Sequence, residues 1–99
     1  KKMETQCKDV RWIETTNDCV EVTHELSGEY EIAVDIESLN EGRNGRISII
    51  QIASKRGDIF IFDIVRLGTE AFGEGGLSFL CYSHKVIKVI FDSRIKCLA

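Results

Sequence analysis

The sequence predicts an α/β fold built on a mixed sheet, with three antiparallel strands followed by a parallel strand and helices on both faces. Three apolar segments, at 31–37, 46–54 and 59–62, are joined by short polar turns and form an antiparallel meander. A crossover then leads to a fourth apolar segment at 85–91, which returns parallel to an earlier strand. The meander segments are apolar at both odd and even positions, which is typical of a sheet covered on both sides.

A strand and a helix precede the meander. Residues 10–15 alternate as a short strand, and the helix that follows has several candidate N-terminal caps: Thr16, Asn17 and Asp18. Apolar side chains then recur at helical spacing, at Cys19, Val22 and Leu26, with Val20 a weaker member. Ser27-Gly28 marks the end of the helix.

The turns of the meander are marked by residues that tolerate a positive φ. Residues 38–45 form a polar turn rich in Asn and Gly, and residues 55–58 form a tight turn. The segment 67–83 is interrupted by glycines and carries a short helix near its end. A further helix is expected to begin at Ser93.

Composition bounds the class of protein. The chain has 99 residues, enough for one domain, and a formal net charge of −3 without a basic run, which argues against a bulk electrostatic nucleic-acid binder. No segment is long and apolar enough for a membrane span, and no signal peptide opens the chain. The four cysteines form no Cys-x-x-Cys pair, so free buried thiols in an intracellular compartment, cytoplasmic or nuclear, are expected.

Three acidic residues on two predicted strands carry the strongest functional signal. Asp35 and Glu37 are two positions apart on one strand and therefore share a face, while Asp92 ends the fourth strand. If the first strand of the meander, at 31–37, lies beside the strand at 85–91, the three carboxylates meet at one edge of the sheet, where a divalent cation would neutralise them. The alternatives are structural: Asp35 as an acid facing a turn, and Asp92 as a cap of the helix that follows it.

The residues around these acids resemble a known family. Residues 33–38 (Ala-Val-Asp-Ile-Glu-Ser) resemble the first motif, and residues 88–94 (Lys-Val-Ile-Phe-Asp-Ser-Arg) the second motif, of the DEDD 3′–5′ exonuclease superfamily, which has an RNase H-like fold. The stretches 40–46, 51–53 and 60–64 resemble one subgroup, the exonuclease 3′–5′ domain-like proteins related to the piRNA-biogenesis factor and to Egalitarian.

The resemblance implies two-metal hydrolysis of phosphodiester bonds at RNA or DNA 3′ ends, with two Mg²⁺ or Mn²⁺ ions about 3.5–4 Å apart. By the resemblance, Asp35 would bridge both ions, Glu37 would hold the ion that generates the attacking hydroxide, and Asp92 would hold the ion at the leaving 3′ oxygen. These three residues are thus both the catalytic and the metal-binding prediction. Protein partners in RNA processing are also expected, whereas binding to a membrane is not.

The family's third motif, a Tyr or His four residues before a further Asp, is expected several tens of residues beyond Asp92. Residues 1–99 are therefore interpreted as the N-terminal portion of a single exonuclease-like domain whose C-terminal part is missing, and efficient turnover by these residues alone is not expected. The alternative function is a catalytically inactive nucleic-acid-binding or scaffold module in RNA processing of the piRNA type. The apolar strand at 86–91 is expected to leave one face uncovered.

Overall fold

A computed structural model describes residues 9–38 and 47–92 of the chain. It contains five strands: β1 Val10–Ile13, β2 Glu31–Glu37, β3 Ile49–Ser54, β4 Ile59–Asp63 and β5 Ile87–Asp92. It also contains the helices α1 Thr16–Leu26, α2 Ile64–Leu67 and α3 Leu77–Tyr82, and the 3₁₀ turn η1 Gly68–Ala71. The polar turn expected at 38–45 lies almost entirely outside the described residues, and so does the helix expected from Ser93.

The strands form one mixed sheet in the order β1-β4-β3-β2-β5. β2, β3 and β4 are the predicted antiparallel meander, and β5 lies parallel to β2, as the crossover predicted. β1 joins the opposite edge by pairing parallel to β4, an arrangement that the sequence pattern did not specify. The sheet thus places the two acid-bearing strands, β2 and β5, next to each other.

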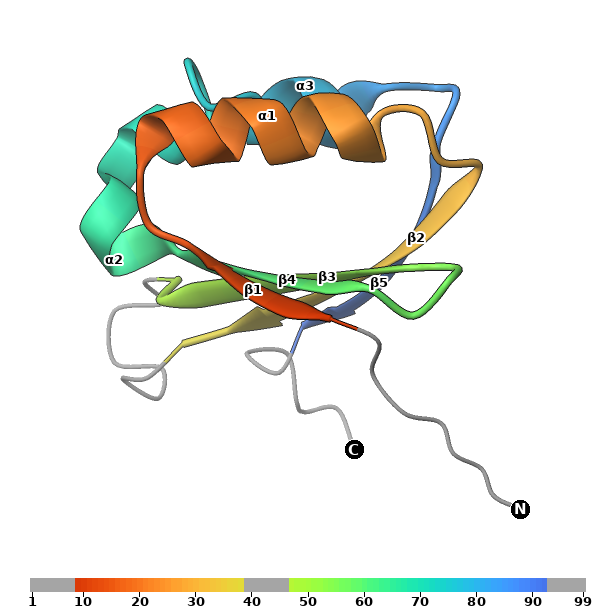
Figure 1. Ribbon diagram of the computed structural model, residues 1–99, viewed down its shortest axis with the longest axis horizontal. Helices are drawn as coiled ribbons and strands as arrows, with labels where there is room; N and C mark the ends of the chain where they lie inside the picture. The colour runs from red at the N-terminus through yellow and green to blue at the C-terminus, as the bar shows by residue number, and fades with distance from the viewer. Residues whose placement is uncertain (1–8, 39–46, 93–99) are drawn as a thin grey trace.

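The described helices all lie on one face of this sheet (Figure 1). Alternation in β3 and β4 is regular, with every second residue buried and the residues between them only half-buried. The prediction of helices on both faces is therefore not met by residues 9–38 and 47–92. The face turned away from the helices also carries apolar residues, such as Ile49 of β3 and Ile61 of β4, and these are only half-buried. They explain why the two strands are apolar at both odd and even positions.

Helix α1 covers the middle of the core. Its cap is Thr15, one residue earlier than the predicted candidates, and the Thr15 side chain accepts a hydrogen bond of 3.2 Å from the Asp18 backbone N–H. The predicted stripe is confirmed, because Cys19, Val22 and Leu26 are all buried. Val20 is exposed and does not belong to it.

The segment between β4 and α3 is more structured than its sequence suggested. The Asp63 carboxylate accepts a hydrogen bond of 3.1 Å from the Arg66 backbone N–H and so caps α2, a helix that was not predicted and that lies mostly before the glycine-interrupted segment at 67–83. Leu67 and Ala71 turn their side chains into the core. A four-residue helix has too few residues to show helical periodicity, so only its contacts define it.

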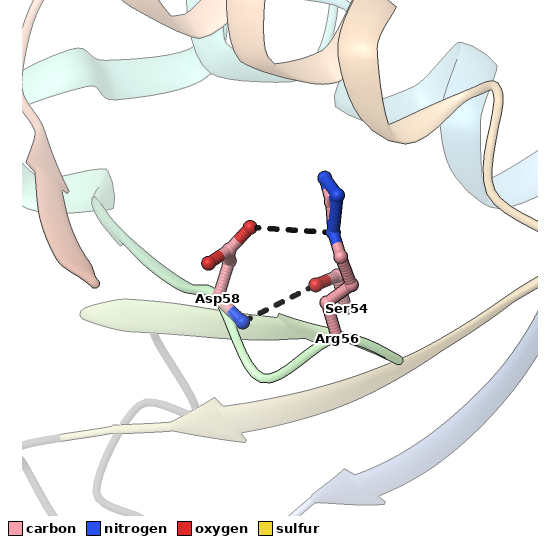
Figure 2. Close-up of polar contacts among 3 residues, drawn as sticks. All are labelled: Ser54, Arg56 and Asp58. Atoms are coloured by element: carbon pink, nitrogen blue, oxygen red, sulfur yellow. Dashed lines mark hydrogen bonds and ion pairs between the residues drawn. The ribbon is translucent and has the colours of Figure 1, made fainter. Parts of the chain in front are cut away.

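The predicted tight turn joins β3 to β4 (Figure 2). The Asp58 backbone N–H donates to Ser54 Oγ at 3.2 Å, and Arg56 Nε lies 3.9 Å from Asp58 Oδ2. Gly57 has a φ of 102°, a conformation that an L side chain disfavours, which explains the glycine at this position. The turn fixes the offset between β3 and β4.

None of the helices within the described ranges has the length and the apolar composition needed to cross a membrane.

Candidate functional site

Asp35 and Glu37 project from the face of β2 that is turned away from the helices. The intervening positions face the core: Val34 is buried, and Ile36 packs against the core cluster. Asp35 is half-buried and Glu37 is exposed. The predicted shared face is thus present, and we refer to this side of the sheet as the acid face.

The neighbours of the pair on the acid face follow from the register. Asp35 lies between Gln51 of β3 and Phe91 of β5, and Glu37 lies beside Ile49. Paired residues of adjacent strands extend to the same side of a sheet, so Gln51 and Phe91 flank Asp35 directly. Gln51 offers an amide group to this row and Phe91 offers an aromatic ring.

Asp92 has a different position. It pairs with Ile36, whose side chain packs against the core on the helical side of the sheet. Because residues in register share a face, Asp92 extends toward the helices rather than toward Asp35 and Glu37. The strand pairing that was predicted to bring the acids together is confirmed, but the register does not place Asp92 with the other two. Its role as a ligand stays a prediction.

The chemistry of the donor set fits a divalent ion. Carboxylate oxygens are the ligands that Mg²⁺ and Mn²⁺ prefer, and the Asp35–Glu37 pair supplies them from one face. Within residues 9–38 and 47–92, no three His, Cys, Asp or Glu side chains gather into a group that could hold a metal. The pair therefore supplies two carboxylates that suit a divalent ion, and the described residues do not complete a two-metal site.

A shallow pocket of about 400 Å³ opens near the same end of the sheet. It is lined by Trp12, Ser48, Ile49, Asp63, Val65 and Arg66. Trp12 belongs to the acid face because it pairs with Ile61, which pairs with Gln51 and so with Asp35. This pocket was not predicted from the sequence, because its lining comes from β1, β3, β4 and α2, and the pairing of β1 with β4 is a tertiary feature.

Both thiols in the described part of the chain are free, as expected. Cys19 is buried, and burial raises its pKa to about 11. Cys81 is exposed, against the expectation of buried thiols, and partial desolvation raises its pKa while nearby Lys88 lowers it. Neither thiol lies with the acid pair, so neither is assigned to the site.

Comparisons with known proteins test the fold assignment independently of the sequence motifs. No model of a known protein family matches the sequence, and no curated protein matches it. Among solved structures, RNase D from Trypanosoma brucei matches 85% of this chain with 29% sequence identity and a TM-score of 0.68. The catalytic core of RRP6 from the same organism matches 86% with 26% identity and a TM-score of 0.69.

A third match has an insect origin. The EXO domain of Nibbler from Aedes aegypti matches 83% of the chain with 17% identity and a TM-score of 0.64. The chain spans 30% of the length of the RNase D chain and 23% of that of RRP6, so it corresponds to only part of each. The chain therefore has the RNase H-like α/β fold of the DEDD 3′–5′ exonuclease domains, in agreement with the resemblance of its two motifs.

Proposed function

We propose that this chain is part of a 3′–5′ exonuclease-like domain that processes nucleic acid with the help of divalent metal ions. The observation that carries the proposal is the joint presence of the exonuclease fold and of the Asp35–Glu37 pair on the acid face of β2. Residues 1–99 are then a portion of a single domain, which agrees with the 30% of the RNase D chain that they span.

The ligands seen with related structures support the substrate class and the cofactor. T. brucei RNase D has been solved in complex with RNA U12 and with GMP, and an EXD2 exonuclease domain has been soaked with Mg and GMP. A single-stranded 3′ end with Mg²⁺ or Mn²⁺ is the corresponding proposal for this chain. Assignment to the subgroup related to the piRNA-biogenesis factor and Egalitarian, and with it the expectation of protein partners, stays a prediction.

Asp35 and Glu37 are the residues that we assign to metal binding. An ion held between them would lower the pKa of bound water and neutralise charge on a phosphate. The two carboxylates would hold the ion on the acid face, where Asp35 is in register with Gln51 and Glu37 with Ile49. β5 lies beside β2, so we propose that a nucleic-acid end approaches along these two strands.

A second candidate function is a nucleic-acid-binding or scaffold module without hydrolysis. The observation that favours it is the register of Asp92, which separates Asp92 from Asp35 and Glu37. Removing one member of a set of catalytic groups that acts as a unit costs orders of magnitude in rate. In this second candidate function, the protein keeps the fold and the nucleic-acid-binding face but does not hydrolyse its ligand.

Titration with Mn²⁺ tests the metal assignment. We expect calorimetry on the chain to show binding, and the Asp35→Asn variant to lower the affinity by about tenfold or more. The control is Glu25→Gln, which removes one exposed carboxylate from α1 in the helical layer and leaves the acid face intact. Equal affinities for the native chain and for Asp35→Asn would exclude the assignment.

A nuclease assay separates the two candidate functions. A single-stranded RNA labelled at its 5′ end is incubated with Mn²⁺ and either the native chain or Asp35→Asn. A ladder of products shortened from the 3′ end, lost in Asp35→Asn, supports the exonuclease. Retention of the intact RNA in a gel-shift assay without a ladder supports the binding module.

A further inference from the structure

We infer that β5 contributes Phe91, and not Asp92, to the acid face, so that Asp35 and Glu37 stand beside an aromatic side chain and bind one divalent ion together with a nucleobase. The inference deepens the proposed function, because it presupposes that Asp35 and Glu37 bind the ion. It concerns which residues complete the site and what class of ligand they recognise.

The first support is the continuity of the β2–β5 register. The pairing runs without interruption from Glu31 with Ile87 to Ile36 with Asp92. No extra residue enters either strand, so there is no bulge that would turn a side chain to the other face. Strict alternation therefore holds through the end of β5, and Phe91 and Asp92 extend to opposite sides of the sheet.

The second support is an anchor near the other end of β5. Lys88 Nζ donates a hydrogen bond of 2.6 Å to the backbone carbonyl of Ser83, the residue that ends α3. Lys88 therefore reaches the helical side, and Asp92, four residues later on the same strand, shares that side. This contact fixes the phase of β5 independently of the residues of β2 that pack in the core.

The separation has a consequence for coordination. Oxygen ligands lie about 2.0–2.1 Å from Mg²⁺, so two oxygens on one ion are within roughly 4 Å of each other. Carboxylates that leave a sheet on opposite faces have the backbone of the sheet between them. Asp92 therefore cannot share an ion with Asp35 while β5 keeps its pairing with β2.

Phe91 supplies a different chemistry at the position next to Asp35. Phe91 is in register with Asp35 on the acid face and is 59% exposed, although it is large and apolar. An aromatic ring cannot ligate Mg²⁺, but it stacks on nucleobases of any sequence. An ion on Asp35 and Glu37 with a ring beside it matches a nucleotide, whose phosphate would meet the ion while its base meets the ring.

Variants that exchange the acid between the two faces test the inference. The full chain and the variants Asp35→Asn, Asp92→Asn and Phe91→Asp/Asp92→Asn are titrated with Mn²⁺ by calorimetry, and thermal unfolding confirms that each is folded. The double variant keeps the native net charge and places a carboxylate beside Asp35 on the acid face, in exchange for that of Asp92. We expect Asp92→Asn to stay within about twofold of the native affinity, and the double variant to bind about tenfold more tightly.

The outcomes separate this inference from the function on which it rests. A loss of affinity in Asp92→Asn as large as in Asp35→Asn would overturn the inference and leave the metal site standing. No change in Asp35→Asn would instead remove the proposed function. A double variant that is folded and binds no more tightly than the native chain would also contradict the assignment of Phe91 to the acid face.

Binding of an RNA probe tests the role of the ring. We expect Phe91→Leu to weaken binding of a fluorescein-labelled single-stranded oligouridylate by about fivefold or more, since stacking on an aromatic ring contributes about 1–3 kcal/mol per base. Phe91→Tyr keeps the ring and should retain the native affinity. Equal affinities for the Leu and Tyr variants would show that the ring does not contact the base.

Discussion

Thr23 Oγ1 donates a hydrogen bond of 2.8 Å to the backbone carbonyl of Gly75 and so ties helix α1 to the loop that leads into α3. The contact is close because the loop residues Gly75 and Gly76 have no Cβ. A Cβ at Gly75 would lie 2.7 Å from Cys19 Sγ, and one at Gly76 would lie 2.6 Å from Thr23 Oγ1. The glycine-rich loop at 73–76 therefore serves helix packing.

Replacing Gly76 with alanine should destabilise the protein. Gly76 has a φ of +95°, so an alanine would be strained as well as too close to Thr23. We expect the free energy of unfolding, measured in urea, to fall by about 1–3 kcal/mol. Gly73→Ala is the matched control in the same loop, because a Cβ there meets nothing within 4 Å. Equal effects of the two substitutions would contradict this account of the packing.

Thr15 should contribute to stability through the cap of α1. Its Oγ1 accepts the 3.2 Å hydrogen bond from the backbone N–H of Asp18. We expect Thr15→Ala to lower the free energy of unfolding by about 1 kcal/mol and Thr15→Ser to restore most of it, because serine keeps the acceptor. Chemical denaturation of the three proteins measures both effects. A serine variant as unstable as the alanine variant would argue that the methyl group, and not the hydroxyl, matters.

The Cys19 thiol should make stability fall at alkaline pH. Its pKa is about 11 in the folded protein, because of burial, against an ordinary value of 9.0. Since the raised pKa means that the unfolded chain loses the proton first, the stabilisation is present below pH 9.0 and is lost as the pH rises toward about 11. Urea unfolding at several pH values, compared with Cys19→Ala, isolates the effect. The same slope in both proteins would rule out Cys19 as its source.

Thiol labelling offers a separate check on the same burial. Cys81 is exposed, whereas Cys19 lies on the buried face of α1. We expect an alkylating reagent to modify Cys81 well before Cys19 at neutral pH, as mass spectrometry of peptides would show. Adding urea should remove the difference. Faster modification of Cys19 in the native protein would contradict the packing of α1.

The strand β5 should drive self-association. It forms one end of the described sheet, and the exposed apolar residues on its two faces are Ile87, Val89, Ile90 and Phe91. The sequence predicted one uncovered face, and both are exposed. An apolar strand edge of this kind invites pairing with another chain.

The variant Ile87→Lys should reduce that association. Lysine there would lie beside Glu31, its partner in the register, and charges on an edge strand oppose further pairing. We expect light scattering after size exclusion to show a smaller mean mass than for the native chain at the same concentration. Val65→Lys is the control, since Val65 is also exposed but lies on α2. If both lysine variants behave alike, β5 is not the associating edge.

The sequence by itself determined the features that depend on residues close together in the chain. The stripe of Cys19, Val22 and Leu26 follows from the helical period, and the shared face of Asp35 and Glu37 follows from the strand period of two. The meander followed from short turns, and the parallel return of β5 from the crossover. Each of these rests on local geometry that every strand or helix shares.

Only the tertiary structure decided how separate elements align. The offset between β2 and β5 puts Phe91 beside Asp35 and turns Asp92 to the helical side, and a shift of one residue would have reversed the two. Segments far apart in the chain are likewise joined by the pairing of β1 with β4 and by the hydrogen bond from Thr23 to Gly75. A sequence pattern gives the faces of each strand, whereas register is set by packing and hydrogen bonding across the whole sheet.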